Sequence, residues 1–438
     1  MDVLVVGGGG REHAICWKLR QSNRVGKLYC APGNAGIAGI AECISISATD
    51  IDAIVSFAVE TPVDFVVVAP DDPLAMGMVD ALTFAGVRAF GPQKGAAIIE
   101  SSKAFSKNLM EKYNIPTAKF RVFSDPDEAK SFIREKGAPI VLKADGLALG
   151  KGVVVAMEVG EAISAVDSIM LDKKFGNSGD MLVIEEFMTG PEVTVLAFTD
   201  GKTIKPMLSS QDHKRAFTGD LGPNTGGMGA FCPSALYTDD IADACMKTIF
   251  KPTIDAMCEE GRPFKGVLYF GLMLTPDGPR VVEYNARFGD PEAQAVLSML
   301  KTDLLDIFEA VVDERLCEIE VDWAEGASCC VVMASGGYPE SYEKGFEITG
   351  LDRVGDEITV FHAGTARPDN AGSYANPSNT AGSGSAYVTN GGRVLGVTAT
   401  GDTLQAAVSR AYEGVSHVTF KNAYFRTDIG KSALEKPK

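Results

Sequence analysis

The first hundred residues of the chain alternate short β-rich runs with segments of helical pattern. Such alternation predicts a parallel sheet with helices on both faces, and ligands bind these sheets at the carboxyl ends of the strands. The runs are VLVV at 3–6, KLYCA at 27–31, DFVVVAP at 64–70 and RAFG at 88–91. We therefore expect an N-terminal α/β domain over residues 1–100, with a binding site in the loop after its first strand.

That loop contains four glycines followed by Arg11. Glycines let a backbone approach a phosphate closely, and a helix starting near Glu12 would point its amide groups at the same place. A dinucleotide site is the alternative. It needs a glycine where Glu12 stands and an acidic residue after the second strand, where the chain has Gly33 and Asn34. The loop is therefore predicted to bind an isolated phosphate or a phosphoribosyl group.

The composition limits the classes of partner. A chain of 438 residues is long enough for three or four domains, and its net charge of −17 disfavours nonspecific binding to nucleic acid or anionic membrane. No apolar run approaches the ~20 residues that span a bilayer, and the N-terminus lacks the basic start of a signal peptide. We expect a cytoplasmic monomer that meets anionic small molecules through local clusters of Lys, Arg and backbone amides.

A second phosphate site is predicted after a lysine-bearing helix expected at 100–113. PIVLKADGLALGKGVVVA, at 139–156, reads as a strand, a glycine-rich turn with Lys151, and another strand. Ammonium groups and loop amides together can cover a triphosphate, although a plain hairpin turn is the alternative. The following segment, 181–198, can offer backbone groups to adenine and a carboxylate to ribose. Its alternative is an ordinary hairpin with solvated glutamates.

Two further segments carry polar groups that suit a substrate. Residues 209–230 are too rich in glycine and charge for a core element, so we interpret them as a substrate-contacting loop, with a solvated loop as the alternative. In RVVEYNARFGDPEAQ, at 280–294, a strand would project Glu283, Asn285 and Arg287 from one face if it ran on that far. Carboxylate and amide oxygens suit Mg²⁺, and an arginine can neutralise a phosphoryl group. A solvated edge strand is the alternative.

Beyond this strand the pattern predicts a helix. Asp290 can cap it, with Pro291 in the first turn. Its apolar positions would form one buried stripe of Val296, Leu297, Leu300, Leu304, Leu305 and Phe308. From about residue 326 the chain reads as a small α/β module, interrupted at 366–387 by a Gly- and Ser-rich surface excursion.

Seven motifs, taken in order, resemble those of the phosphoribosylamine–glycine ligase family of the ATP-grasp group. They are VLVVGGGGREHA (3–14), APGNAG (31–36), VLKADGLALGKGV (141–153), SSQDHKR (209–215), PNTGGMGA (223–230), EYNARFGDPE (283–292) and FHAGT (361–365). Segment 366–387 departs from the family by being longer and richer in Gly and Ser. The resemblance implies an α/β multidomain enzyme: an N-terminal parallel-sheet domain (1–100), an ATP-grasp core (101–325) with a mobile lid (about 121–190), and a small C-terminal α/β domain (326–438).

The resemblance also implies an activity. ATP would phosphorylate the carboxylate of glycine to glycyl phosphate, and the amine of 5-phosphoribosylamine would displace phosphate to give glycinamide ribonucleotide in de novo purine (IMP) synthesis. Phosphorylation would give a poor acylating agent a good leaving group. Another ATP-grasp carboxylate–amine ligase is the nearest alternative. A nicotinamide oxidoreductase and a noncatalytic nucleotide-binding module are the alternatives from other classes.

Finally, the resemblance assigns roles to motif residues. Glu283 and Asn285 would bind Mg²⁺ or Mn²⁺, while Arg287, Asp212 and Lys214 would act in catalysis. ATP would contact Lys103, Lys143, Asp145, Gly146, Gly150, Lys151, Gly152, Glu185, Glu186, Phe187 and Glu192. The other substrates would contact Gly8, Gly9, Gly10, Arg11, Gly33, Asn34, Thr225, Gly226, Gly227, Met228, Gly229 and Asp290.

Overall fold

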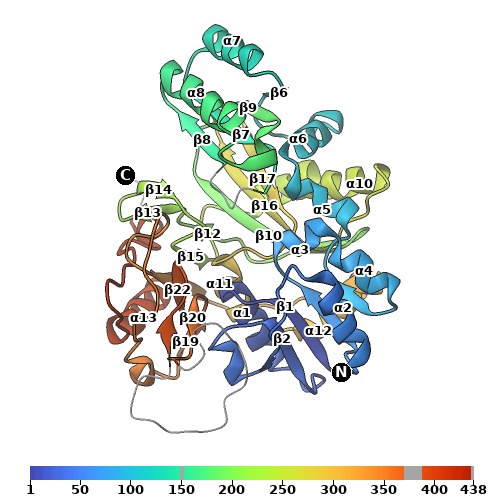
Figure 1. Ribbon diagram of the computed structural model, residues 1–438, viewed down its shortest axis with the longest axis vertical. Coiled ribbons are helices and arrows are strands. Elements are labelled where there is room, and N and C mark those ends of the chain that lie inside the picture. Colours follow the sequence, from blue (N-terminus) through green and yellow to red (C-terminus); the bar gives the residue numbers. More distant parts are fainter. Residues whose placement is uncertain (148–151, 369–386, 436–438) are drawn as a thin grey trace.

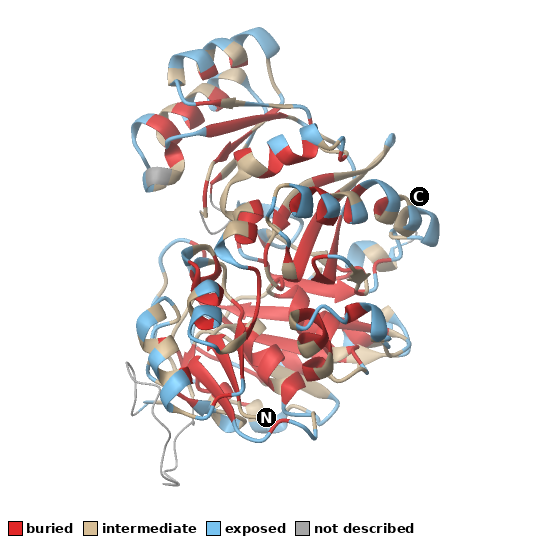
Figure 2. Cartoon of the chain, turned by 90° about the vertical axis from the view of Figure 1, so that its right-hand side faces the viewer, coloured by how far each residue is buried: buried red, intermediate tan, exposed pale blue. Residues whose placement is uncertain are grey.

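The computed structural model describes residues 1–147, 152–368 and 387–435. Four sheets of four or five strands carry the architecture, and Figure 1 shows the N-terminal sheet and the C-terminal sheet side by side below a separate unit that contains β6 to β9. Figure 2 shows that buried residues concentrate on these sheets and on the helix faces against them. None of the described helices is both long and apolar enough to cross a membrane.

The N-terminal sheet is parallel throughout, in the order β3-β2-β1-β4-β5, which confirms the prediction from the alternating pattern. Every residue of β1 is buried, because helices cover both faces of the sheet. The strands are β1 (Val3–Gly7), β2 (Leu28–Pro32), β3 (Glu42–Cys43), β4 (Phe65–Val68) and β5 (Arg88–Phe90). The helices between them are α1 (Gly10–Leu19), α2 (Ile51–Glu60), α3 (Asp71–Met76) and α4 (Met78–Phe84).

The helix expected at 100–113 is present as α6 (Lys103–Lys112), and a separate helix, α5 (Lys94–Ser101), precedes it. The expected start at Glu100 was wrong, because Ser102 is extended and its hydroxyl accepts the N–H of Phe105 at 3.0 Å, which caps α6. The break leaves Glu100 at the end of one helix and Lys103 at the start of the next.

The unit of β6 to β9 is an antiparallel sheet in the order β6-β9-β7-β8. Its elements are β6 (Phe120–Phe123), α7 (Pro126–Lys136), β7 (Ile140–Ala144), β8 (Val153–Ala156), α8 (Val159–Val166) and β9 (Leu182–Glu186). Strand β9 does not pair with the next strand, β10 (Glu192–Asp200), which belongs to another sheet. The ordinary hairpin considered for 181–198 is therefore wrong, and this segment connects two sheets.

The central sheet has the order β11-β10-β16-β17 and is antiparallel. Its other strands are β11 (Ile204–Pro206), β16 (Lys265–Thr275) and β17 (Gly278–Asn285). Helices α9 (Asp239–Cys245) and α10 (Lys251–Glu259) lie between β11 and β16 in the chain. Their buried residues share a core with Phe270 and Leu272 of β16 and with apolar residues of the N-terminal sheet.

The C-terminal sheet has the order β12-β15-β18-β22-β19. Its strands are β12 (Gln211–Asp212), β15 (Gly229–Cys232), β18 (Ala327–Ala334), β19 (Ile358–His362) and β22 (Arg393–Gly401), with α13 (Leu404–His417) packed on it. The predicted substrate loop at 209–230 is thus built into this sheet through β12 and β15. A small hairpin, β13 (Arg215–Phe217) and β14 (Leu221–Asn224), lies between them.

The apolar stripe predicted after Asp290 is buried, but it is divided between two helices and Leu300 in the segment that joins them. The helices are α11 (Glu292–Ser298) and α12 (Leu304–Val312). Asp303 starts the second helix by accepting the N–H of Leu305 at 2.9 Å. The N-cap of α11 is Pro291, so the cap expected from Asp290 is wrong. Helix α11 contacts α1 on one side and β15, β18 and β22 on the other, which joins the N-terminal and C-terminal sheets.

Candidate active site

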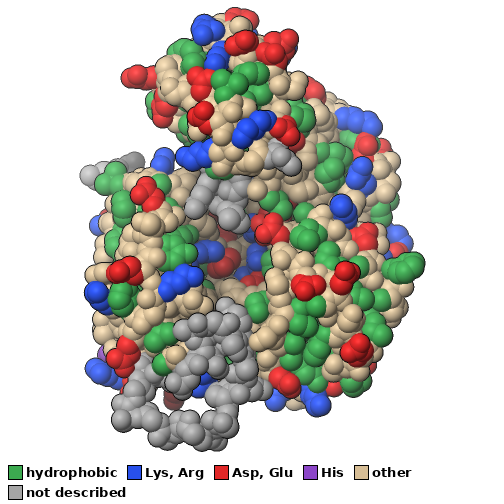
Figure 3. Space-filling view, in the orientation of Figure 1, with side chains coloured by type: hydrophobic (Ala, Val, Ile, Leu, Met, Phe, Trp, Pro, Cys, Tyr) green, Lys and Arg blue, Asp and Glu red, His purple; other side chains and the backbone are tan. Residues whose placement is uncertain are grey.

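Figure 3 shows a hollow at the centre of one face, between the unit of β6 to β9 and the two units below it. Acidic and basic side chains lie together inside the hollow. A concave surface with charged groups of both signs is typical of a small-molecule site.

Glu283 and Asn285 lie two positions apart at the end of β17, opposite Gly271 and Tyr269. Alternate residues of a strand share a face, so the two side chains project together, as predicted. The strand ends at Asn285, so Arg287 lies beyond it and the longer strand considered from the sequence is wrong. The arginine still reaches the same place, because its Nη2 donates to Asn285 Oδ1 at 3.1 Å.

Glu283 is surrounded by ammonium groups. Lys214 Nζ lies 3.4 Å from a Glu283 carboxylate oxygen and 3.0 Å from Glu192. Burial raises the pKa of the Glu283 carboxyl, but the lysines around it outweigh burial and lower this pKa to about 2. These lysines are Lys214, Lys143 and Lys103. Glu283 is therefore ionised at any working pH and can offer its charge to a cation.

The donor chemistry of this edge fits a hard divalent cation. A carboxylate and an amide oxygen are ligands that Mg²⁺ accepts, and Mg²⁺ usually keeps waters and substrate phosphates as its remaining ligands. Within residues 1–147, 152–368 and 387–435, no three His, Cys, Asp or Glu side chains gather as a complete protein-only metal site. Glu283 and Asn285 would therefore share an ion with a bound phosphate.

Glu185 lies buried between two lysines. Its Oε1 is 2.9 Å from Lys143 Nζ, and its Oε2 is 3.0 Å from Lys107 Nζ. Burial raises the pKa of the Glu185 carboxyl, but the two ammonium groups reverse this effect and lower it. The carboxylate thus orients both lysines. Lys107 was missed from the sequence, although it follows Lys103 by one helical turn and so lies on the same face.

Lys103 binds the loop that follows β7. Its Nζ donates to the carbonyl of Gly146 at 2.9 Å. Asp145 accepts the backbone N–H of the second residue of α6 at 3.0 Å, which fixes the start of that helix against the loop. Two residues predicted to cover ATP, Gly150 and Lys151, lie outside the residues that the structure describes.

The other predicted ATP-binding residues in the described part of the chain lie at the ends of strands or directly beside them. Glu186, the last residue of β9, pairs with Arg280 at 3.3 Å, and Phe187 next to it is exposed. Glu192 is the first residue of β10. The carbonyl of Gly152 accepts an N–H from the end of β7 at 2.9 Å. The segment from Glu186 to Glu192 therefore connects the sheet of β6 to β9 with the central sheet.

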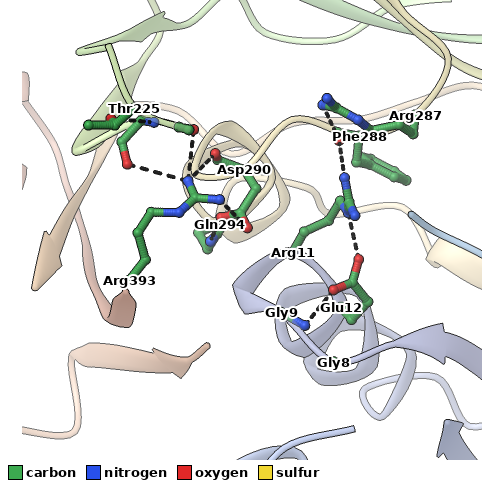
Figure 4. Close-up of polar contacts among 12 residues, drawn as sticks. Gly8, Gly9, Arg11, Glu12, Thr225, Arg287, Phe288, Asp290, Gln294 and Arg393 are labelled. Carbon is green, nitrogen blue, oxygen red and sulfur yellow. Dashed lines mark hydrogen bonds and ion pairs between the residues drawn. The ribbon is translucent and has the colours of Figure 1, made fainter. Parts of the chain in front are cut away.

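Glu12 closes the glycine-rich loop at the start of α1 (Figure 4). One of its carboxylate oxygens accepts the N–H of Gly9 at 2.5 Å, and the other pairs with Arg11 Nε at 2.6 Å. Arg11 also donates from Nη1 to the carbonyl of Phe288 at 3.2 Å. Glu12 thus stands where a dinucleotide fingerprint has glycine. Its carboxylate accepts the Gly9 N–H, one of the loop amides that the sequence pattern predicted to bind a phosphate.

Asn34 connects the same loop to the C-terminal sheet. Its Nδ2 donates to the carbonyls of Gly8 at 3.0 Å and His362 at 2.8 Å, and its Oδ1 accepts two backbone N–H groups, each at 2.9 Å. The hydrogen-bonding capacity of the amide is used within the protein. Gly8 must remain glycine, because a Cβ there would lie 2.4 Å from the carbonyl oxygen of Gly33.

Arg393, the first residue of β22, joins the loop after β14 to the turn before α11 (Figure 4). Its Nη1 donates to the carbonyls of Gly226 at 2.8 Å and Asp290 at 2.5 Å, and its Nη2 lies 3.0 Å from Asp290 Oδ2. Within the loop, the Thr225 hydroxyl accepts the N–H of Gly227 at 2.9 Å. Met228 and Gly229 follow and are buried. Sequence reasoning missed Arg393, since no local motif links it to residues so distant in the chain.

A pocket of about 310 Å³ opens between the N-terminal loop and the C-terminal sheet. Its size is at the lower end of the ~300–1,000 Å³ common for small-molecule sites. Gly10, which begins α1, follows the loop residues that line it. The lining residues are Gly8, Gly9, Asp290, Ala363, Gly364, Thr365, Asn390 and Arg393. The pocket thus brings together predicted substrate residues from two distant motifs with C-terminal residues that were not predicted.

Asp212 lies in β12, paired with Ala230 of β15. Burial raises the pKa of its carboxyl to about 7; Lys214 opposes this rise, while acidic neighbours, Glu292 foremost, add to it. Burial also raises the pKa of Glu292. A carboxyl group that titrates near neutrality can exchange a proton with a substrate amine.

Family models match three consecutive parts of the chain. They describe the phosphoribosylglycinamide synthetase N domain at residues 1–100, its ATP-grasp (A) domain at 101–293 and its C domain at 328–432. The chain is 47% identical over 434 residues to the phosphoribosylamine–glycine ligase of Halalkalibacterium halodurans, an alignment that covers 99% of this chain and 97% of that protein.

Two solved structures resemble the chain, one in sequence and fold and the other in fold. The phosphoribosylamine–glycine ligase from Thermotoga maritima superposes with a TM-score of 0.82 at 31% identity and covers 98% of this chain and 100% of its own. The biotin carboxylase domain of 2-oxoglutarate carboxylase from Hydrogenobacter thermophilus, solved with MgADP and bicarbonate, has a TM-score of 0.72 at 15% identity, covering 97% of this chain and 91% of that one. At that identity the second likeness concerns the fold alone.

Proposed function

The chain belongs to the phosphoribosylglycinamide synthetase family, and we propose that it joins 5-phosphoribosylamine and glycine into glycinamide ribonucleotide while ATP becomes ADP and phosphate. The reaction is a step of de novo purine synthesis. The observation that carries the proposal is the meeting of Glu283, Asn285 and Arg287 at one edge, with the lysines that Glu185 orients beside it.

In the first step, an oxygen of the glycine carboxylate attacks the γ-phosphorus of ATP. A carboxylate O–P bond forms, the bond from this phosphorus to the β–γ bridging oxygen breaks, and ADP leaves. Lys103 and Lys143 are proposed to bind the phosphates, and Arg287 to stabilise the charge on the transferred group. This is catalysis by positioning and electrostatics, which suits a transfer that needs no protein nucleophile.

Glu283 and Asn285 are proposed to hold a divalent cation, Mg²⁺ or Mn²⁺. Such an ion, when bound, neutralises charge on the β- and γ-phosphates. Lys214 pairs with Glu283 in this structure and also with Glu192, so it keeps one carboxylate partner when Glu283 turns to a cation.

In the second step, the amine nitrogen of 5-phosphoribosylamine attacks the carbonyl carbon of glycyl phosphate. A C–N bond forms, the C–O bond to phosphate breaks with its electron pair going to phosphate, and the nitrogen loses a proton. Asp212 is proposed to accept this proton, because a carboxyl with a pKa of about 7 is half ionised near neutral pH.

The phosphoribosyl group is proposed to occupy the 310 Å³ pocket. Arg393 offers positive charge there, and Thr365 and Asn390 offer a hydroxyl and an amide. On the nucleotide side, the loop from Gly146 to Gly152 is proposed to cover the triphosphate, residues 185–187 to line adenine, and Glu192 to contact ribose. We further propose a cytoplasmic monomer without a nucleic-acid partner. The net charge of −17 supports the last part of this proposal, because it disfavours nonspecific binding to nucleic acid.

A coupled assay of ADP release tests the proposed function. The purified chain is assayed with MgATP and freshly generated phosphoribosylamine, with and without glycine, and glycinamide ribonucleotide is measured in parallel. We expect ADP and the ribonucleotide in equal amounts, with each of the two acceptors required for sustained turnover. ADP release without glycine, or with bicarbonate in its place, would favour a different ATP-grasp reaction.

A further inference from the structure

One acidic side chain outside all the motifs contacts the edge where Glu283, Asn285 and Arg287 meet, which is the proposed place of phosphoryl transfer. Glu100 lies in the last turn of α5, in the N-terminal part of the chain, and is only 8% exposed. Its Oε2 accepts the backbone N–H of Ala286 at 2.7 Å, and its Oε1 lies 3.0 Å from Arg287 Nη2. A single carboxylate therefore binds the main chain and the side chain of two consecutive residues directly after β17.

The contact continues from Arg287 to the predicted cation ligand. The same Nη2 that faces Glu100 donates to Asn285 Oδ1 at 3.1 Å, while Nη1 donates to the carbonyl of Phe288 at 3.2 Å. Both ends of the guanidinium fork are thus fixed by acceptors, and Glu100 is the charged one among them. Charge-assisted bonds of this kind hold an arginine in one geometry more strongly than neutral bonds do.

The pair is also enclosed. The side chains of Arg287 and Glu100 are 19% and 8% exposed, so water competes little for either group. Asp71, in α3 of the same N-terminal part, adds a second negative charge near this guanidinium. Two N-terminal helices therefore supply negative charge to an arginine that follows β17 of the central sheet.

We propose that Glu100 is a positioning residue for the ligase reaction, orienting Arg287 and the chain at Ala286 so that the guanidinium and Asn285 face the phosphoryl group together. This inference rests on the proposed function. It differs from a merely structural ion pair between neighbouring units, which would stabilise the fold and leave the chemical step unchanged.

Glu309 offers the matched control. It lies on α12, is 12% exposed, and pairs with Arg88, the first residue of β5, at 2.9 Å and with Arg24, which precedes β2. E309Q therefore removes an ion-pair acceptor of comparable burial between the same parts of the chain. It should leave kcat and each KM within about twofold of the wild type, as expected for a pair that only stabilises.

The test is a double-mutant cycle of E100Q and R287K, assayed by glycine-dependent ADP release. We expect E100Q to lower kcat roughly 10- to 100-fold with each KM within about threefold, because misplaced catalytic groups cost rates of this order. If Glu100 acts through Arg287, the double variant should be no more than about threefold slower than the slower single variant, because effects of groups that act as a unit do not multiply.

Two results overturn the role of Glu100: an E100Q enzyme with kcat within twofold of an active wild type, or losses of E100Q and R287K that multiply. A wild type without glycine-dependent ADP release overturns the proposed function, and this role with it. If E100Q fails to fold, E100D keeps the charge at shorter reach. Its kcat should fall while its KM values hold, and an unchanged kcat in E100D contradicts the proposal equally.

Discussion

The carboxylate of Glu185 lies 2.9 Å from the ammonium group of Lys143, and both side chains are buried. Glu185 lies on β9 and Lys143 on the adjacent β7, where Val141 pairs with Glu185 and Lys143 with Val183. The sheet register therefore places Lys143, the lysine proposed to bind phosphate, beside a fixed negative charge. Lys107 from α6 pairs with the other carboxylate oxygen of Glu185 at 3.0 Å.

Removing members of this group should destabilise the protein unequally. E185Q removes the carboxylate that pairs with two buried ammonium groups, and breaking a buried pair in this way costs about 3–5 kcal/mol. K107M leaves Glu185 paired with Lys143, so we expect a smaller loss, about 1–3 kcal/mol. Urea unfolding measures both. A K107M variant less stable than E185Q would contradict the arrangement.

Replacing Glu283 by alanine should abolish turnover and preserve the fold. The variant loses an ionised ligand for the cation, so we expect glycine-dependent ADP release to fall at least roughly 100-fold. E314A is the matched control, because Glu314 also pairs with two lysines, Lys202 and Lys265, but away from the site. Near-normal activity of E283A at ordinary Mg²⁺ concentrations would refute the assignment of this ligand.

Replacing Arg393 by glutamine should weaken the binding of phosphoribosylamine more than that of ATP. The variant loses the positive charge in the pocket and the clasp between Gly226 and Asp290, so we expect its KM for phosphoribosylamine to rise roughly tenfold, as for a lost charged hydrogen bond. Arg410 is the control, since it lies on α13 and pairs with Glu357 at 3.4 Å. An equal rise in R410Q, or in the KM for ATP, would argue against the pocket.

Asp212 should make stability depend on pH in a defined direction. Its pKa is raised from 3.8 to about 7 in the folded protein, so between these values the folded state binds more protons than the unfolded state. Stability from this group is therefore present at low pH and is lost as pH rises through 7. D212N lacks the effect. Urea unfolding at pH 5 and pH 8 should show the wild type losing stability relative to D212N, and parallel pH profiles would contradict the raised pKa.

Local sequence patterns predicted which helices and strands form better than they predicted the residues at which these elements begin and end. The alternating apolar runs specify the parallel sheet, because a strand buried on both faces must be apolar throughout. The division of α5 from α6 at Ser102 and of α11 from α12 before Asp303 follows from capping side chains within apparently continuous helical patterns. Nor does any local pattern show that β12 and β15 join the C-terminal sheet, since strand pairing depends on tertiary packing.

The candidate site shows the same limit. Glu283 and Asn285 could be placed on one face because a strand has a fixed period, and the structure confirms that geometry. Glu100, Lys107 and Arg393 could not be found in this way. Each reaches the site from another part of the chain, through contacts to Arg287, Glu185 and Asp290 that only the fold creates.

The transfer of oxygen from glycine to phosphate tests the central claim most directly. Glycine labelled with ¹⁸O in its carboxylate is converted with MgATP and phosphoribosylamine, and the released phosphate is analysed by mass spectrometry. If glycyl phosphate forms, the carboxylate oxygen that attacked ATP leaves with phosphate, so each phosphate should carry one ¹⁸O atom. Phosphate without the label, released in step with glycinamide ribonucleotide, would contradict the account.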